Sequence, residues 1–462
     1  MRKSTRSRLG FVLALSLVLA GCEGPCSKIE PLTAPSSSTG GLDPTTYVAA
    51  GTSISAGWQS GGLVDRHQVH AFPAIFARQL GKTVQLDGRG TFTQPVYDHD
   101  GFPQLLHIAS YSPLVISGTG RATGNPINLS QPTPYHDMAV PFAIGFDFVD
   151  TTYYYNSTVH PPVAIPLFNN IVRHNGTIAA NVLSLAPTFI TWEYGVNEVL
   201  GPASTGVAPA TNTAEQFTPV LTASLDAIHA AAPNAKIALF NIPNAGGIPF
   251  ATTFPAFTVS LSTGQPVPLV GVDGPLQFGD LVLLTAGPLL ATGTGIPAGG
   301  YNYVNPLAPS NGQPLPENVI LRGPEIAQTI VELTQMNVAI AIEAAARPYV
   351  ALVDLHGLFQ TLHQDGLVLG GTQYTTDFIT GGLFSLDGIH PNDLAHAVIA
   401  NTLIDAVNAR FGASIQRVNP TDWATPTASA ASPVGPDGKP MPRIDDLSER
   451  LPKPIPPFVT LH

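Results

Sequence analysis

Two short segments of the chain carry the residue types of a hydrolytic site. The first is Gly51–Gly57 (GTSISAG), which contains Ser53, and the second is Asp387–Pro391 (DGIHP), which contains Asp387 and His390. A serine hydroxyl is a poor nucleophile at neutral pH unless an imidazole accepts its proton and an acceptor orients the other imidazole nitrogen. Because the second segment supplies both partners within four residues, we predict that the two segments meet in the fold.

Elements of two kinds alternate along the chain between these segments. Runs rich in β-branched and aromatic residues predict strands at 47–50, 188–192, 236–240 and 349–354. Amphipathic stretches predict helices near 72–80, from Thr213 onward with Gln216 at capping-box spacing, from Pro324 through Ile330 to residue 340, and from Asn392 to residue 412.

This alternation is typical of a three-layer α/β/α sandwich with a mainly parallel sheet. Ligands of open parallel sheets bind beyond the carboxyl ends of the strands. Ser53 and Asn197 each lie just past a predicted strand. The two residues are therefore candidates for the same site.

The first residues of the chain are typical of an exported lipoprotein. Basic residues precede an apolar run at 9–20 that is too short to span a bilayer, and the run ends in LAGC at 19–22. This ending resembles the bacterial lipobox, so we expect a signal peptide at 1–21 and a lipid anchor on Cys22. The alternative is an ordinary signal peptide cleaved after Ala20. Glu23 stands where many inner-membrane lipoproteins carry aspartate, which favours the outer membrane.

We expect one large domain at 46–417, between a flexible tether at 22–45 and a proline-rich tail at 418–462. Two stretches near 90–155 and 249–321 interrupt the alternation of strands and helices. They form walls or a lid over the site, or they only pad its rim.

The composition limits the kinds of partner. Apolar residues make up 44% of the chain and charged residues 11%, and the formal net charge is −11. Typical globular proteins have about 25% charged residues. Since no basic cluster follows the signal, no nucleic-acid partner is expected.

Four segments resemble the sequence blocks of the SGNH/GDSL hydrolase superfamily, in the family's chain order. They are Gly51–Gly57 with Thr52 in place of the usual aspartate, 136–143 (HDMAVPFA) with Phe142 at the expected glycine, 194–198 (YGVNE) with Glu198 for the final aspartate, and 385–391 (SLDGIHP). The resemblance spans about residues 45–415 and is closest to large secreted or lipoprotein members. An α/β-hydrolase is disfavoured because Ile54-Ser55 breaks the Gly-x-Ser-x-Gly motif.

The resemblance implies a role for each matched residue. Ser53 would attack an ester carbonyl, His390 would act as general base and then acid, and Asp387 would orient the imidazole. The backbone N–H groups of Ser53 and Phe142 and the side-chain amide of Asn197 would form the oxyanion hole. Neither a metal nor an organic cofactor would take part.

Two functions from different classes fit these observations. The first is a carboxylic ester hydrolase, for which the weakly charged insertions favour lipid or acyl esters. The second is a non-catalytic envelope lipoprotein that uses the same scaffold to bind a ligand or partner, and Thr52 and Phe142 motivate it.

Three further features have two interpretations each. Asp98-His99-Asp100 is a metal-ligand set or, as we expect, a solvated loop. Trp58 lines a pocket or packs on a helix face. The tyrosines at 153–155 stack on a sugar or lie against a lid.

Overall fold

The structure is a computed structural model that describes residues 38–111, 114–120, 123–173 and 175–423. The expected signal peptide at 1–21, Cys22, most of the tether and most of the tail lie outside the described residues.

The centre of the fold is a four-stranded parallel sheet with the strand order β1-β4-β5-β12. Its strands are β1 (Tyr47–Gly51), β4 (Phe189–Glu193), β5 (Lys236–Phe240) and β12 (Val350–Val353). They coincide with the four predicted strands, and the predicted fold class is confirmed.

A short extended segment at 137–140 continues the sheet beyond β1. The N–H groups of Met138 and Val140 donate to the carbonyls of Ala49 and Gly51 at 2.8 and 2.9 Å, and Ala49 pairs with Asp137 in parallel orientation. The stretch near 90–155, expected to be an insertion, therefore contains an edge of the central sheet.

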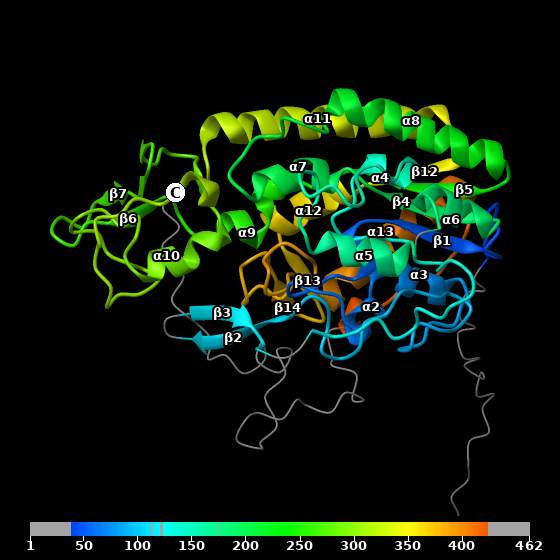
Figure 1. Ribbon diagram of the computed structural model, residues 1–462, viewed down its shortest axis with the longest axis horizontal. Helices are drawn as coiled ribbons and strands as arrows, with labels where there is room; N and C mark the ends of the chain where they lie inside the picture. Colours follow the sequence, from blue (N-terminus) through cyan, green and yellow to red (C-terminus); the bar gives the residue numbers. More distant parts are fainter. Residues whose placement is uncertain (1–37, 112–113, 121–122, 174, 424–462) are drawn as a thin grey trace, which may run out of the picture. The chain divides into compact units, whose positions relative to one another are not determined.

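Side chains of the sheet alternate between two apolar cores because neighbouring residues of a strand point to opposite faces. Val48 and Trp192 belong to one core, and Tyr47 and Phe189 to the other. Helices α6, α8 and α11 cover the first face, and α3 and α13 cover the second (Figure 1). The sheet is thus the middle layer of a sandwich.

The helices of the described residues are α1 (Ser53–Ala56), α2 (Asp65–Gln68), α3 (Phe72–Gln79), α4 (Gly145–Val149), α5 (Ala164–Ile171), α6 (Ile178–Ser184), α7 (Val196–Ala203), α8 (Ala214–Ala231), α9 (Pro249–Thr252), α10 (Gly287–Ala291), α11 (Gly323–Ala346), α12 (Leu355–Gln364) and α13 (Asp393–Phe411). Short 3-10 helices are η1 (Ala245–Gly247), η2 (Leu284–Ala286), η3 (Glu317–Val319) and η4 (Pro420–Trp423).

The four predicted helices correspond to α3, α8, α11 and α13. Thr213 forms the predicted capping box at the start of α8, and the Asn392 side chain caps α13. One detail of α11 differs from the prediction. Ile330, expected on the packed face, is 49% exposed. Among the described residues, we find no helix with the length and apolarity needed to cross a bilayer.

Outside the central sheet, the strands pair as short antiparallel hairpins and ribbons. They are β2 (Leu106–Tyr111) with β3 (Leu114–Gly118), β6 (Phe257–Val259) with β7 (Pro266–Pro268), β8 (Val270–Gly271) with β9 (Gly274–Pro275), β10 (Leu281–Val282) with β11 (Ile320–Leu321), and β13 (Leu367–Leu369) with β14 (Thr372–Tyr374). The stretch at 249–321 packs around a small apolar core of its own, which includes Leu269, Leu290 and Leu315.

Candidate active site

Ser53 is the first residue of α1 and follows directly from β1. A buried carboxylate holds the turn on which it lies. Glu193, at the end of β4, accepts hydrogen bonds from the Thr52 N–H (2.9 Å), the Thr52 hydroxyl (3.0 Å) and the Ser55 hydroxyl (2.9 Å). Burial raises the pKa of Glu193, although these hydrogen bonds oppose the shift. Residues on both sides of Ser53 are thereby fixed to the neighbouring strand.

The close approach of β1, α1 and Glu193 requires glycine at position 51. Gly51 pairs with Glu193 in the register of the sheet. A Cβ atom on Gly51 would lie 2.3 Å from the Ser55 hydroxyl oxygen and 2.8 Å from a carboxylate oxygen of Glu193. Any larger residue would displace the turn that carries Ser53.

The structure brings Ser53, His390 and Asp387 together in one chain of hydrogen bonds. The Ser53 hydroxyl lies 2.8 Å from Nε2 of His390, and Nδ1 of His390 lies 2.9 Å from a carboxylate oxygen of Asp387. Because an ionised carboxylate can only accept, Nδ1 donates to Asp387 and Nε2 is left to accept the serine proton. This is the arrangement in which an imidazole can act as a general base toward serine.

Asp387 is held as an anion by the loop around it. Its carboxylate also accepts from the N–H groups of Ile389 and His390 (both 2.9 Å), from the Ser385 hydroxyl (3.1 Å) and from the Gly61 N–H (3.1 Å). Burial alone would raise the pKa of Asp387, but attraction to His390 and these hydrogen bonds lower it to about 2. The carboxylate therefore stays ionised at neutral pH.

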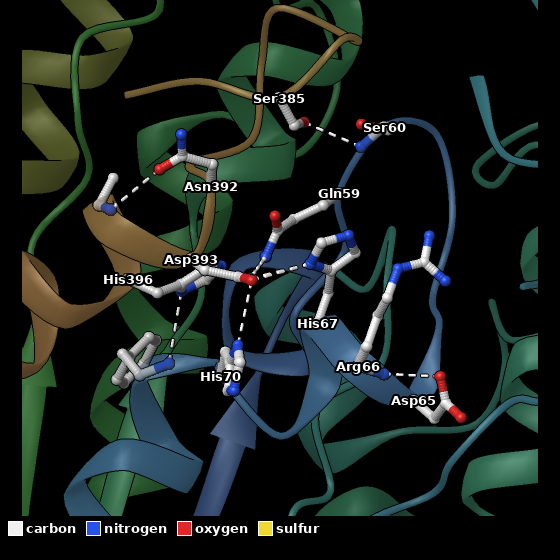
Figure 2. A network of polar contacts seen from close by, with 12 residues as sticks. Gln59, Ser60, Asp65, Arg66, His67, His70, Ser385, Asn392, Asp393 and His396 are labelled. Carbon is white, nitrogen blue, oxygen red and sulfur yellow. Dashed lines mark hydrogen bonds and ion pairs between the residues drawn. The ribbon is translucent and has the colours of Figure 1, made fainter. Parts of the chain in front are cut away.

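The partly buried carboxylate of Asp393 ties the turn after Ser53 to the start of α13 (Figure 2). Asp393 accepts from the Gln59 side-chain amide at 2.7 Å and lies 2.9 and 3.0 Å from Nδ1 of His67 and His70. Burial would raise the pKa of Asp393, but attraction to His67 and hydrogen bonds from both histidines hold it well below its usual range. Since α13 begins just after His390, this network links the serine and histidine segments a second time.

The backbone at Phe142 has the conformation that a glycine would adopt freely. Its φ is +70°, in the left-handed region that non-glycine residues rarely occupy. Phe142 follows the 137–140 segment, which is hydrogen-bonded to Gly51, so it lies beside the end of β1. Within the part of the chain that the structure describes, neither the Ser53 nor the Phe142 N–H has a hydrogen-bond acceptor. Neither N–H group is therefore used by the described fold itself.

Asn197 and Glu198, in the first turn of α7, hold the loop that follows Phe142. The Asn197 side-chain amide donates to the Ala143 carbonyl at 2.8 Å, and Glu198 accepts from the Gly145 N–H at 2.6 Å. Burial raises the pKa of Glu198 to about 8. Because an amide carries two hydrogens, Asn197 retains one for a ligand.

A small cavity of about 20 Å³ lies where these residues meet. Ser53, Asn197 and His390 line it, together with apolar residues that include Leu200 and Ile248. Of the three expected oxyanion donors, Ser53 and Asn197 line this cavity and Phe142 does not. The cavity holds a group about as large as one water molecule, which suits the reacting atoms of an ester.

No family model and no curated protein matches the sequence. The comparison with solved structures finds similar chains, among them two lipases. A GDSL-like lipase from Parabacteroides merdae has 10% sequence identity and a TM-score of 0.34, with 79% of this chain and 97% of that chain covered. An extracellular lipase from Streptomyces rimosus has 11% identity and a TM-score of 0.34, with 78% and 99% covered. At such identities the similarity says nothing about which reaction this chain performs.

The remaining residues singled out in the sequence lie outside the small cavity. Trp58 is buried in a core, with its ring 5.2 Å from that of Phe142 and 6.0 Å from that of His390, as expected of a packing residue. Asp98-His99-Asp100 lies in a turn with His99 exposed. Within the described ranges, we find no group of three or more histidine, cysteine or acidic side chains that could hold a metal ion.

The three tyrosines at 153–155 have different surroundings. Tyr154 is buried, and its hydroxyl donates to the Asp147 carbonyl at 2.8 Å. Tyr155 is 46% exposed, and the Tyr153 ring packs on Phe146. Tyr154 is therefore part of a core, and the three side chains do not form a common surface.

Sequence reasoning missed Glu193. Glu193 is the last residue of a strand whose other residues are apolar or β-branched (FITWE). In the sequence it therefore looks like an ordinary strand end. The available signal was an acidic residue at the carboxyl end of a predicted central strand, two residues before the Gly-x-Asn block. This carboxylate helps to fix the turn that carries Ser53, a role for which the resemblance implied an acidic residue at position 52.

Proposed function

We propose that the protein is a serine hydrolase that cleaves carboxylic esters. The observation that carries the proposal is the hydrogen-bonded chain from Asp387 through His390 to Ser53, which ends in a cavity also lined by Asn197. A serine, an imidazole and a carboxylate in this order are the parts needed for acyl transfer through a covalent intermediate.

In the proposed reaction, Ser53 Oγ attacks the ester carbonyl while its proton passes to Nε2 of His390. Asp387, held ionised, stabilises the resulting imidazolium. The N–H groups of Ser53 and Phe142 and the Asn197 amide donate to the developing oxyanion. His390 then gives the proton to the leaving alcohol. Water, activated by the same imidazole, releases the acid from Ser53.

The substrates we favour are lipid or acyl esters. The support is compositional, because the stretches near 90–155 and 249–321 are rich in apolar and small residues and carry little charge. A polysaccharide substrate would be expected to meet more polar and charged side chains.

We also propose that the protein is attached to the bacterial cell envelope through lipid on Cys22, at the outer membrane. The support is the basic start, the apolar run at 9–20 and the lipobox-like LAGC. Growth with a labelled fatty acid should label the parent protein but not Cys22→Ser, and equal labelling of both would refute the anchor. Membrane fractionation then tests the outer-membrane assignment.

A fluorophosphonate probe tests the chemistry directly. It should label the parent protein and should not label Ser53→Ala. Circular dichroism and thermal melting of both proteins control for folding. A correctly folded parent that does not react would refute the esterase proposal and favour the non-catalytic envelope lipoprotein.

A further inference from the structure

A second, larger cavity adjoins the small cavity at Ser53. Its volume is about 220 Å³, roughly ten times that of the small one. It lies between α7, η1, α9, β10 and α11, and its walls include Phe250, Leu281, Leu321, Ile326 and Ile330. No charged side chain is among the described residues that line it. Such walls suit an apolar ligand and offer nothing to neutralise a charged one.

The two cavities share three lining residues, Leu200, Asn244 and Ala245. The small cavity has room for little more than one water-sized group, for which about 10–15 Å³ is required. A substrate whose carbonyl reaches Ser53 must therefore place its remaining atoms elsewhere. The adjoining apolar cavity is a space of suitable size and chemistry.

Either half of an ester, the acyl chain or the alcohol, could extend from Ser53 into the large cavity. His390 must protonate the leaving alcohol, so the alcohol lies on the His390 side of the reacting carbon. Leu200 belongs to α7, the helix that carries Asn197, while Ser53, Asn197 and His390 themselves line only the small cavity. Because the junction includes a residue of the helix that carries the expected oxyanion donor, we assign the large cavity to the acyl half of the ester, and the two ester series below separate this from the alcohol half.

We propose that this cavity binds the acyl chain of the substrate, and that the substrates are esters of carboxylic acids whose apolar chain is long enough to extend from Ser53 into it. The inference rests on the proposed esterase function and adds the location and chemical class of the acyl site. It also accounts for the exposure of Ile330, whose side chain forms a wall of the cavity in place of packing on the sheet.

Each methylene group of the acyl chain that is buried in the transition-state complex should raise kcat/KM about fourfold. An octanoyl ester has six more methylene groups than an acetyl ester. If three of them are buried, the octanoyl ester should be hydrolysed with a kcat/KM about 60-fold higher.

Two series of esters test the assignment on the purified protein. In the first, the acid varies from acetyl to dodecanoyl with nitrophenol as the common leaving group. In the second, acetate is the common acid and the alcohol varies from ethanol to octanol. We expect kcat/KM to rise with acid length in the first series and to change little in the second.

A tryptophan at position 330 should fill part of the cavity. Loss of space for two methylene groups should lower the octanoyl-to-acetyl ratio of kcat/KM by about 15-fold in Ile330→Trp. Ile342→Trp is the matched control, since Ile342 lies on the same helix, is 61% exposed and does not line the cavity. Its ratio should equal that of the parent. Ala245→Phe, which narrows the junction between the cavities, should lower the ratio by a second route.

Three results would overturn the acyl site while leaving the esterase function intact. They are a parent that prefers acetyl esters, a rate that follows alcohol length but not acid length, and a ratio that neither Ile330→Trp nor Ala245→Phe alters. Failure of the esterase function would look different. In that case no ester of either series would be hydrolysed, and the fluorophosphonate probe would not label Ser53.

Discussion

Removal of the Glu193 carboxylate should damage the site more than any other change outside the triad. In Glu193→Ala, the Thr52 N–H and the hydroxyls of Thr52 and Ser55 lose their acceptor, and both residues are completely buried. Each buried polar group left without a partner costs about 1–3 kcal/mol, so the three together cost about 3–9 kcal/mol. This is a large part of the usual stability of a domain, about 5–15 kcal/mol.

Glu193→Gln isolates the role of the charge. The glutamine oxygen can accept from the Thr52 N–H and the Ser55 hydroxyl, and its amide can donate to the Thr52 hydroxyl. Because only the charge-assisted part of these hydrogen bonds is lost, we expect a cost of about 1–2 kcal/mol. Its rate of fluorophosphonate labelling should stay within about tenfold of the parent rate, which corresponds to about 1.4 kcal/mol.

Glu332→Ala is a matched control for general destabilisation. Glu332 is also a buried glutamate that accepts from a backbone N–H, that of Ala214 at 2.8 Å, but it holds the start of α8 and not the nucleophile turn. Denaturant unfolding gives the stability of each variant, and the labelling rate of the folded fraction reports on Ser53. Glu332→Ala should lose stability only. A Glu193→Ala protein with the stability and labelling rate of the parent would show that Glu193 does not hold the turn that carries Ser53.

Four further predictions concern the oxyanion loop and pH. Asn197→Ala should lower kcat for a nitrophenyl ester about 10² to 10³-fold with little change in KM, and an unchanged kcat would exclude Asn197 from the oxyanion hole. Asp387→Asn should lower the free energy of unfolding by about 2 kcal/mol above pH 4, because the pKa of Asp387 in the folded protein, about 2, lies below the ordinary 3.8. Denaturant titrations should show the stability difference between parent and variant shrinking as the pH falls from 4 to 2. A difference that stays constant would contradict this prediction. Glu198→Gln should become increasingly more stable than the parent as the pH rises from about 4.5 to 8, since the raised pKa of Glu198 means that folding opposes its ionisation. A difference in melting temperature between variant and parent that does not widen over this range would contradict the prediction. Phe142→Gly should be about 1 kcal/mol more stable than Phe142→Ala because only glycine accepts a φ of +70° without strain, and the opposite order in denaturant unfolding would argue against a strained backbone.

The central sheet and its main helices could be predicted because their signals are local. The runs of β-branched and aromatic residues in the strands, the capping box at Thr213 and the glycine stop after α13 each lie within a few residues. The triad residues could be singled out because Asp387 and His390 lie close in sequence and the resemblance supplied the serine. The chemistry of the three residues implied that they meet in space, but local sequence patterns could not place them together.

The rest of the site depends on contacts between distant segments. Glu193 reads as part of a strand, and its role becomes visible only when β1 and β4 are paired in register. The large cavity forms where α7, residues 244–251 and 279–283, and α11 converge. The exposure of Ile330 follows from that convergence. No periodicity of α11 alone could distinguish it from Leu333, which is buried on the same helix.

The hydrogen bond between Ser53 and His390 joins residues 337 positions apart. While the chain is being synthesised, every nascent chain that ends before Asp387 contains the serine but has no imidazole to deprotonate it. If Ser53 is the nucleophile that we propose, it remains inert until the whole central sheet has been made and α13 can dock. Cleavage of the backbone anywhere between the two segments would silence the protein if the halves then separated, although both segments would be chemically intact.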